Sequence, residues 1–585
     1  PVDRWQQPRE EMDAISLLAL LFLFFAGVAG QCDNVKVLQE WQGNYQAEFR
    51  DNAPKDIDGL RLELSFQSRV LRLELQKGSV EQVDDFTFII TDPALKVSAG
   101  EEVWYLIQVY YYFTFPQVVK NVMNDELLCE DNTLTTPEPM VNPCDATGMK
   151  PHDYAQVLCM SYVFYEAQRS GPLPADQRVT WRGDSALDDG SDVGHDLSGG
   201  YYDAGDHVKF GFPMAFTTTM LGWGLVDFLE GHQEAGQEKY GLAAIKWATD
   251  YFLKAHTDTY EFYGQVGSGG PDHAYWGRPE DMTMDRPSYK IDATNGGTEL
   301  AGETAAALAV ASVAFQESDA AYASALLDHA KQLYDFADKY RKNYHDSIPD
   351  ASAFYRSWNG YGDELCWAAL WLAKATGDDQ FIEKAKAHWE EFDLTKDSVA
   401  QFSWDDKRAG VYALFYNLTS DTQYLDLLNV YLDWLKSGAT YTPEGLVHLD
   451  AWGANRHAAN VAFISLWAAK HGIDGKKNRE WARGQIGQLL GDNSRYERSF
   501  VVGYGQNPPE RPHHRSSSCP FPPSDCHFGL LQPGPNVHTL YGALVGGPSQ
   551  NGEYEDDRQD YVRNEVACDY NAAFTAALAA LVEIS

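Results

Sequence analysis

The sequence predicts a protein of two unlike parts, a small all-β sandwich followed by a larger all-α domain. Apolar and polar residues alternate over residues 31–130, as they do in strands that are buried on one face. From Tyr154 onward the apolar residues recur with a helical period instead. A chain of 585 residues is also longer than one ordinary domain. We therefore expect a multidomain protein.

The residues before the predicted sandwich have the features of an export signal. Residues 12–30 form an apolar run that ends in small residues suited to signal-peptide cleavage. The apolar core of this run, residues 15–28, is shorter than a typical membrane-spanning helix. We expect residues 1–11, which precede a candidate initiator Met12, to be translated leader. No other stretch suggests a membrane span, so we expect a secreted protein without membrane association.

The strand-like segments of the first domain are residues 60–64, 71–75, 86–90 and 103–115. Their short lengths and alternation are typical of a β-sandwich.

Within this domain Cys32, Trp41-Gln42-Gly43, residues 57–60 and Cys129 together resemble a family-two carbohydrate-binding module. Such modules bind cellulose through a row of exposed tryptophans, whereas this domain contains only Trp41 and Trp104, and Leu60 stands where the family usually has Trp. Two interpretations stay open: a cellulose-binding module, or a sandwich whose aromatic residues are core or whose face binds weakly.

Residues 131–150 are rich in Thr, Pro and Asn, which is typical of a linker. The helical pattern then occupies residues 151–585, with about twelve helices by apolar spacing. Their predicted starts lie near residues 154, 214, 236, 299, 320, 363, 378, 408, 421, 456, 477 and 566. Alternating short and long connections predict helical hairpins closed into a ring. The long connections carry Gly, Asp, Trp and His, so we expect the chemistry at one end of the ring, and we expect no strands in this part.

The composition limits the partners. A formal charge of −39 repels phosphate backbones, which argues against nucleic acid and polyanionic substrates. A neutral polymer remains compatible, and an aromatic content of 13% suits a protein that stacks against flat ligands.

Eight cysteines in an exported chain permit disulfides, and no C-x-x-C spacing indicates a metal or redox site. Two pairs and two buried free thiols are expected: Cys32 with Cys129, Cys519 with Cys526, and unpaired Cys366 and Cys568.

Asp203 and Asp206 are the first candidate catalytic residues. They lie in the glycine-flanked loop Tyr201-Tyr202-Asp203-Ala204-Gly205-Asp206, just before a helical pattern. Two nearby carboxylates can hold a water molecule while one accepts its proton, and their repulsion raises at least one pKa. The same pattern also occurs in Asp-rich turns and helix caps, so the motif alone does not decide.

Glu565 is the candidate acid. We expect it to open the last helix, residues 566–584, where the helix N-terminus favours the carboxylate over the proton donor. Desolvation by Tyr561 and Tyr570, with repulsion from the two aspartates, would have to raise its pKa. An ordinary first-turn Glu is the alternative. Glycoside hydrolysis needs this combination of one protonated carboxyl and one carboxylate that activates water.

Residues 499–515 contain the pair His513-His514, followed by Arg515. Neighbouring histidines in an extended loop point apart and no third ligand is suitably spaced, so we do not predict a metal here. Donors to sugar hydroxyls fit better, and Arg515 suits a bidentate contact with a carboxylate.

Five ordered motifs make residues 154–585 resemble the catalytic domain of glycoside hydrolase family nine, the endo-β-1,4-glucanases called cellulases. They are FYEAQRSG (164–171), WRGDS (181–185), YYDAGDHVKFGFPMAF (201–216), SFVVGYGQNPPERPHHRSS (499–517) and YEDDRQDYVRNEVACDYNAA (554–573). The resemblance implies an (α/α)6 barrel and inverting hydrolysis of internal bonds of cellulose. Another β-glucan, such as lichenan or xyloglucan, and a non-catalytic glucan-binding protein remain as alternatives. We expect a monomer.

The resemblance also implies roles for individual residues. Asp206 is the general base, Asp203 helps to hold the water and Glu565 is the general acid, while His513, Arg515 and Asp556 belong to the active centre. The implied substrate-binding residues, which include the aromatic side chains that stack on pyranose rings, are His273, Trp276, Tyr355, Trp358, Trp452 and Tyr570.

A calcium site occurs in part of the family, and residues 358–365 resemble its ligand segment. The implied oxygen ligands, a set that suits a hard cation, are Asn359, Gly360, Asp363, Glu364 and the distant Asp405. Asn359 replaces the usual Ser. The alternative is that Asp363 and Glu364 only begin a helix with negative charge. No cofactor is expected to be needed for the chemistry.

Overall fold

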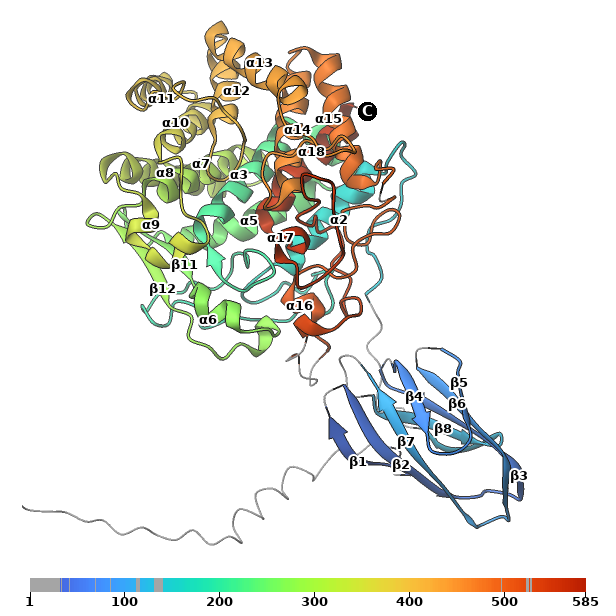
Figure 1. Cartoon of the computed structure of the whole chain (residues 1–585). Helices are drawn as coiled ribbons and strands as arrows, with labels where there is room; N and C mark the ends of the chain where they lie inside the picture. The colour runs from blue at the N-terminus through green and yellow to red at the C-terminus, as the bar shows by residue number, and fades with distance from the viewer. Residues whose placement is uncertain are drawn as a thin grey trace, which may run out of the picture. The chain divides into compact units, whose positions relative to one another are not determined.

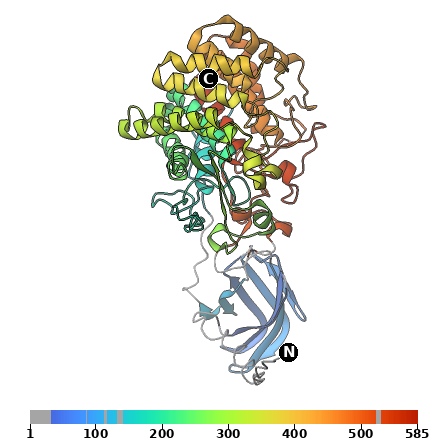
Figure 2. The same cartoon turned by 90° about the vertical axis from the view of Figure 1, so that its left-hand side faces the viewer.

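The structure is a computed structural model of the 585-residue chain. It describes residues 32–584 apart from 33, 42, 69, 85, 112–115, 131–139, 496, 522–525 and 527–528. The predicted leader and signal peptide lie outside the described residues. The chain divides into two compact units, Pro1–Glu138 and Pro139–Ser585, which are considered separately (Figures 1 and 2).

The N-terminal unit consists of two antiparallel sheets. One has the strand order β1 (Val35–Trp41), β2 (Asn44–Asn52), β7 (Glu102–Tyr110), β4 (Arg72–Leu75). The other has the order β5 (Ser79–Gln82), β6 (Thr87–Val97), β3 (Ile57–Phe66), β8 (Val118–Met123), β9 (Glu126–Glu130).

Alternate residues of β2 and β3, such as Phe49 and Leu62, are buried in one core that both sheets share. The predicted sandwich and the Cys32–Cys129 disulfide are therefore confirmed.

Twelve helices of at least twelve residues build the described part of the C-terminal unit. Six of them contact one another in a closed ring, because each packs on the next and the last packs on the first. In ring order they are α3 (Gly211–Asp227), α7 (Thr298–Phe315), α10 (Gly362–Thr376), α12 (Arg408–Thr419), α14 (Ala454–Lys470) and α18 (Cys568–Ile584). Most of their side chains are buried, so this ring is the core of the unit.

Each of the six remaining long helices packs mainly on one helix of the ring. They are α5 (Glu238–Ala255) on α3, α8 (Ala320–Lys339) on α7, α11 (Asp379–Glu391) on α10, α13 (Thr422–Ser437) on α12, α15 (Gly475–Leu490) on α14, and α2 (Tyr154–Ala167) on α18. All twelve starts lie within three residues of the predicted positions, which confirms the helical pattern.

Short elements occupy the connections. They are α4 (Leu229–Glu234), α6 (Gly269–Ala274), α9 (Tyr344–Ser347), α16 (Arg515–Ser518), α17 (Tyr561–Asn564), η1 (Pro279–Asp281), η2 (Pro349–Ala353) and η3 (Gly529–Leu531).

One expectation for this unit was wrong, because three short strands form an antiparallel sheet: β10 (Lys209–Phe210), β11 (Glu261–Val266) and β12 (Ser288–Asp292). The central strand β11 is buried along almost its whole length, so it lacks the alternation that would have revealed it.

The helix α7 is long and apolar enough to cross a membrane by length and composition, which the sequence analysis did not anticipate. Its apolar window is 89% buried inside the protein. Its place in the ring explains this composition, since a helix covered on all sides needs no polar face.

The second half of the predicted linker belongs to the helical unit. Cys144 forms a disulfide with Cys159 of α2, a pair that the sequence analysis did not predict. The backbone N–H groups of Thr147 and Gly148 each donate to the Asp153 carboxylate at 2.7 Å, and Asp153 also caps α2. The predicted Cys519–Cys526 disulfide and the buried free thiols of Cys366 and Cys568 are confirmed.

Candidate active site

The loop that carries Asp203 and Asp206 lies directly against the His513 segment. The backbone N–H of Arg515 donates to the carbonyl oxygen of Gly205 at 3.1 Å. A Cβ atom on Gly205 would lie 2.0 Å from the carbonyl oxygen of His513, so only glycine permits this approach. Two motifs that are about three hundred residues apart in the sequence thus meet in one site.

Glu565 joins the same site through backbone contacts. The N–H of His513 donates to the carbonyl of Asn564 at 2.8 Å, and the N–H of Cys568 donates to the carbonyl of Asp203 at 2.8 Å. Glu565 follows α17 in an extended conformation, and the last helix begins only at Cys568. The expectation that Glu565 opens the last helix was therefore wrong, and the opposing effect of a helix N-terminus does not apply to it directly.

Asp203 is buried and accepts a 2.5 Å hydrogen bond on Oδ2 from the hydroxyl of Tyr355. Burial raises the pKa of Asp203 well above its usual value, and the negative charge of Asp206 adds to the rise, while the Tyr355 hydrogen bond opposes it. The two aspartates therefore do not share the negative charge equally.

Asp206 is the ionised member of this pair. Its carboxylate accepts hydrogen bonds from the backbone N–H groups of Ala204 at 3.1 Å and Val208 at 3.3 Å, and its Oδ2 lies 3.5 Å from Nε2 of His273. Burial acts to raise the pKa of Asp206, but His273 and Arg515 overcome this effect and hold the pKa below its usual value.

Glu565 has the opposite tendency. Burial and the charge of Asp206 raise its pKa to about 7, although Oε2 accepts a 3.2 Å hydrogen bond from the indole N–H of Trp452, which favours the ionised form. Near neutral pH this carboxyl group therefore carries a proton in a large fraction of the molecules, while Asp206 carries none.

His513 and Arg515 border these carboxyl groups. Nδ1 of His513 lies 2.7 Å from the carbonyl oxygen of Arg558 and must donate to it, so the neutral ring keeps its proton there. Burial lowers the pKa of His513 to about 4. Arg515 is buried and makes a single approach to Asp272, 3.9 Å from Nη1 to Oδ1, rather than the expected bidentate contact.

The predicted substrate-binding aromatic residues differ in exposure. Trp358 is 75% exposed and Trp452 is 44% exposed, as expected of platforms that meet a ligand. Trp276 and Tyr355 are partly buried. Tyr570 is buried, with its ring 5.0 Å from the Arg456 guanidinium, so it contributes to the wall of the site.

Asp556 binds the backbone of the segment that precedes His513. Its carboxylate accepts hydrogen bonds from the backbone N–H groups of Glu510 at 2.9 Å and Arg511 at 3.1 Å. These contacts fix the segment that leads to His513.

The sequence analysis missed Asp272, although it directly precedes the predicted residue His273. Oδ1 of Asp272 accepts the backbone N–H of His207 at 3.1 Å, and burial together with the charge of Asp206 raises its pKa to about 6. Among the described residues, Asp206, Asp272 and His273 form the one group of three ionisable side chains whose ligand atoms all lie within 4.8 Å of one another. Only the fold reveals this proximity.

Two of the expected calcium ligands bind Lys407. Asp363 accepts a 2.7 Å hydrogen bond from the Lys407 backbone N–H, and Glu364 accepts one of 2.8 Å from its Nζ. Asp405 instead accepts the backbone N–H of Trp358 at 2.9 Å. Among the residues that the structure describes, none forms a hydrogen bond with Oε2 of the buried Glu364, so these oxygen donors fit a hard cation. A calcium ion here stays a prediction.

Comparison with known proteins places this site among glycosidases. The sequence profile of glycosyl hydrolase family 9 matches residues 154–578. Endoglucanase A of Bacillus pumilus is 48% identical over 448 residues, which cover 74% of this chain and 67% of that protein. The structure of an endoglucanase from the termite Nasutitermes takasagoensis is similar with 56% identity and a TM-score of 0.72, covering 74% of this chain and 99% of that one. The cellulase Cel9M of C. cellulolyticum in complex with cellobiose is similar with 36% identity and a TM-score of 0.69, covering 74% of this chain and 100% of that one.

Proposed function

This chain belongs to glycosyl hydrolase family 9, and on that premise we propose that it is a secreted endo-β-1,4-glucanase that hydrolyses internal bonds of cellulose with inversion. The family match and the similarity to named endoglucanases support the activity. The closed ring of six helices, each covered by one outer helix, supports an (α/α)6 barrel.

In this proposal the reaction uses two carboxyl groups with opposite protonation. Glu565 donates its proton to the leaving oxygen, while Asp206 accepts a proton from the water that attacks the opposite face of the sugar. Asp203, held by Tyr355, orients that water. His513, neutral and fixed by the Arg558 carbonyl, offers Nε2 toward sugar hydroxyls, and Arg515 adds positive charge near Asp206.

The observation that carries the proposal is the pair of opposed pKa shifts. The pKa of Asp206 is lowered and that of Glu565 is raised to about 7 within one site. A structural ion cluster has no need of a protonated carboxyl beside an ionised one, whereas a general acid and a general base require this difference.

Two conservative variants test the assignment. Glu565→Gln and Asp206→Asn should each lower kcat on carboxymethylcellulose by about 10²- to 10⁴-fold, because each removes one proton transfer. Near-normal activity of Glu565→Gln would refute the mechanism. Proton NMR of fresh products should show the α-anomer first. An initial β-anomer would refute inversion but not the hydrolase activity.

Two alternatives have different outcomes. If lichenan or xyloglucan is hydrolysed faster than cellulose in a substrate panel, the specificity changes but the chemistry stands. If the purified protein binds cellulose and releases no reducing sugar, it is a glucan-binding protein on this fold.

We further propose that the N-terminal unit binds β-glucan on the outer face of its four-stranded sheet. On β2, Asn44 pairs with Trp41 of β1, and Arg50 pairs with Trp104 of β7. Asn44 and Arg50 alternate with the core residues of β2, so their partners Trp41 and Trp104 lie on the outer face of the sheet. These two cross-strand pairs are six residues apart along β2, which corresponds to roughly 20 Å. Trp41 is 43% exposed, whereas the Trp104 indole donates to Glu48 at 3.1 Å.

Depletion by crystalline cellulose tests this surface. In the full chain carrying Glu565→Gln, which prevents hydrolysis, Trp41→Ala should leave more protein in the supernatant than the parent. Equal depletion would refute binding through this face.

Four further properties belong to this proposal: export, calcium binding, a monomeric state and the lack of another cofactor. Three disulfides suit an exported protein. Calcium, if bound by Asp363, Glu364, Asp405 and the carbonyls near Asn359 and Gly360, should raise Tm, and a chelator should reverse the rise. We propose that the enzyme is monomeric and needs no other cofactor, which light scattering and metal analysis can test.

A further inference from the structure

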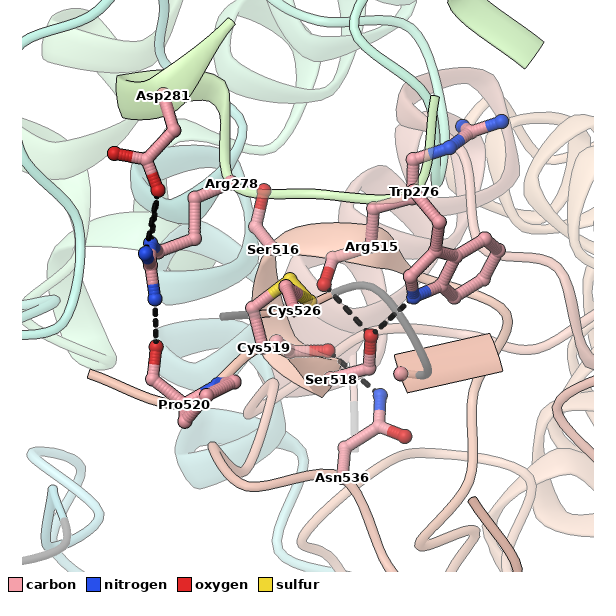
Figure 3. The surroundings of a disulfide bond; sticks show 12 residues. Trp276, Arg278, Asp281, Arg515, Ser516, Ser518, Cys519, Pro520, Cys526 and Asn536 are labelled. Carbon is pink, nitrogen blue, oxygen red and sulfur yellow. Dashed lines mark hydrogen bonds and ion pairs between the residues drawn. A yellow bond between two sulfur atoms is a disulfide. The ribbon is translucent and has the colours of Figure 1, made fainter. Parts of the chain in front are cut away.

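Trp276 lies beside the Cys519–Cys526 disulfide. Its indole N–H donates to Oγ of Ser518 at 2.9 Å, and Ser518 is the last residue of α16 and directly precedes Cys519 (Figure 3). The Ser518 hydroxyl in turn donates to the carbonyl of Arg515 at 2.8 Å. Because Ser518 is fully buried, both hydrogen bonds are shielded from water.

The other end of the disulfide also lies at Trp276. A Cβ atom on Gly529 would lie 2.7 Å from Nε1 of Trp276 and 3.1 Å from Sγ of Cys526, so the glycine backbone is wedged between the indole and the sulfur. The N–H of Gly529 donates to the carbonyl of Cys526 at 2.9 Å. Both half-cystines thus adjoin a residue that contacts Trp276.

A further contact ties this segment to the chain that carries Trp276. Nη1 of Arg278 donates to the carbonyl of Pro520 at 2.6 Å, while its Nε donates to Asp281 at 2.6 Å. Arg278 is two residues from Trp276 and Pro520 is next to Cys519, so the two segments are joined at a second point.

The position of Trp276 matters because its ring also contacts two residues of the candidate active site. Its ring is 5.1 Å from the His513 ring in an edge-to-face arrangement, and the Arg515 guanidinium lies 5.3 Å from its centre. A shift of the indole would therefore disturb the His513 imidazole and the Arg515 guanidinium, which border the catalytic carboxyl groups.

We propose that Ser518 is a positioning residue for the sugar-binding face of Trp276, and that the Cys519–Cys526 disulfide holds Ser518 and Gly529 in place for this task. The disulfide then serves substrate binding in addition to the stability of the fold. This inference rests on the proposed function, since it assumes that Trp276 contacts the glucan.

A double-mutant cycle tests the part of Ser518. Ser518→Ala should raise KM for cellohexaose by about two- to tenfold, the equivalent of one hydrogen bond, with a smaller change in kcat. Trp276→Phe keeps an aromatic face but removes the N–H donor. If Ser518 acts through that donor, the double variant should have the same KM as the Trp276→Phe single variant.

Ser517→Ala is the matched control, because Ser517 is an equally buried serine of α16 whose hydroxyl accepts from Asn536 at 2.8 Å. Any effect that it has on KM should persist in the Trp276→Phe background. If the effect of Ser518→Ala persists there as well, the inference is wrong.

The disulfide is tested by comparing two pairs of replacements. Both double variants should lower Tm. Cys519→Ser with Cys526→Ser should also raise KM, whereas Cys144→Ser with Cys159→Ser should leave KM unchanged. Equal KM for both double variants and the parent would overturn the role of the disulfide. An inactive parent enzyme would instead refute the proposed function, and an active parent whose KM is unaffected by Trp276→Ala would refute this inference alone.

Discussion

The indole N–H of Trp452 donates a 3.2 Å hydrogen bond to Oε2 of Glu565. Trp452 is 44% exposed, and its ring lies 5.5 Å from the ring of Tyr561, so one side chain borders both solvent and the candidate acid. The hydrogen bond favours the ionised form of Glu565 and opposes the burial and the Asp206 charge that raise its pKa to about 7. Trp452 therefore helps to set the pH at which this group loses its proton.

The first prediction concerns the pH dependence of kcat/KM. The acid must carry its proton, which it holds below a pKa of about 7, so kcat/KM should fall as the pH rises through about 7. Trp452→Phe removes a donor that lowers this pKa, and the alkaline limb should move to higher pH. Trp358→Phe is the control, because this exposed indole contacts Arg356. An unmoved limb in Trp452→Phe would contradict the relationship.

The second prediction concerns the hydroxyl of Tyr355. Tyr355→Phe removes the 2.5 Å hydrogen bond to Asp203, so the pKa of Asp203 should rise further and the water should lose an orienting group. Because Asp206 is the ionised member of the pair, the lost hydrogen bond is one to a neutral carboxyl group and corresponds to about two- to tenfold in kcat. Tyr334→Phe removes a buried hydroxyl that contacts His388 on the outer helices, and should change Tm but not kcat. Similar kcat values for both variants would refute the prediction.

The third prediction concerns the close approach of the two catalytic loops. Gly205→Ala places a methyl group 2.0 Å from the carbonyl oxygen of His513, so one of the loops must move. We expect a destabilisation of about 1–3 kcal/mol and a loss of most activity. Gly484→Ala, in α15 with open space around its Cβ position, should instead raise stability by about 0.5–1 kcal/mol. Thermal unfolding and activity assays of both variants decide the matter, and an active Gly205→Ala enzyme would contradict the packing.

The helices could be predicted from the sequence because their spacing is local. A helix such as α8 shows its buried face every third or fourth residue, and its start at Ala320 agrees with the prediction. The strand β11 lacks such a signal because nearly all of it is buried. The disulfide of Cys144 was missed because the surrounding Pro and Thr are typical of a linker, and only the fold shows that this segment packs on α2.

The candidate site divides in the same way. Asp203, Asp206 and Glu565 lie in motifs that are complete in the sequence, so they could be named before the fold was known. The raised pKa of Asp272 depends on its distance from Asp206, and the anchoring of Trp276 depends on Ser518. Contacts between segments that are so far apart have no periodicity or local pattern that would predict them.

The last prediction concerns the Cys144–Cys159 disulfide. The bond closes a loop with a sequence separation of 15 and joins the end of the predicted linker to α2. In the chain-entropy description, a loop of this size contributes about 3 kcal/mol, because the unfolded chain keeps the constraint. Cys144→Ser with Cys159→Ser should therefore lower the free energy of unfolding by about 3 kcal/mol.

The active site should be unchanged, since the nearby Asp153 carboxylate still binds Thr147 and Gly148 and caps α2. Denaturant unfolding with and without the pair measures the effect, with Cys366→Ser as a control that alters a buried free thiol without breaking a bond. Equal stability of the double variant and the parent would show that the hydrogen bonds of Asp153 alone hold this segment.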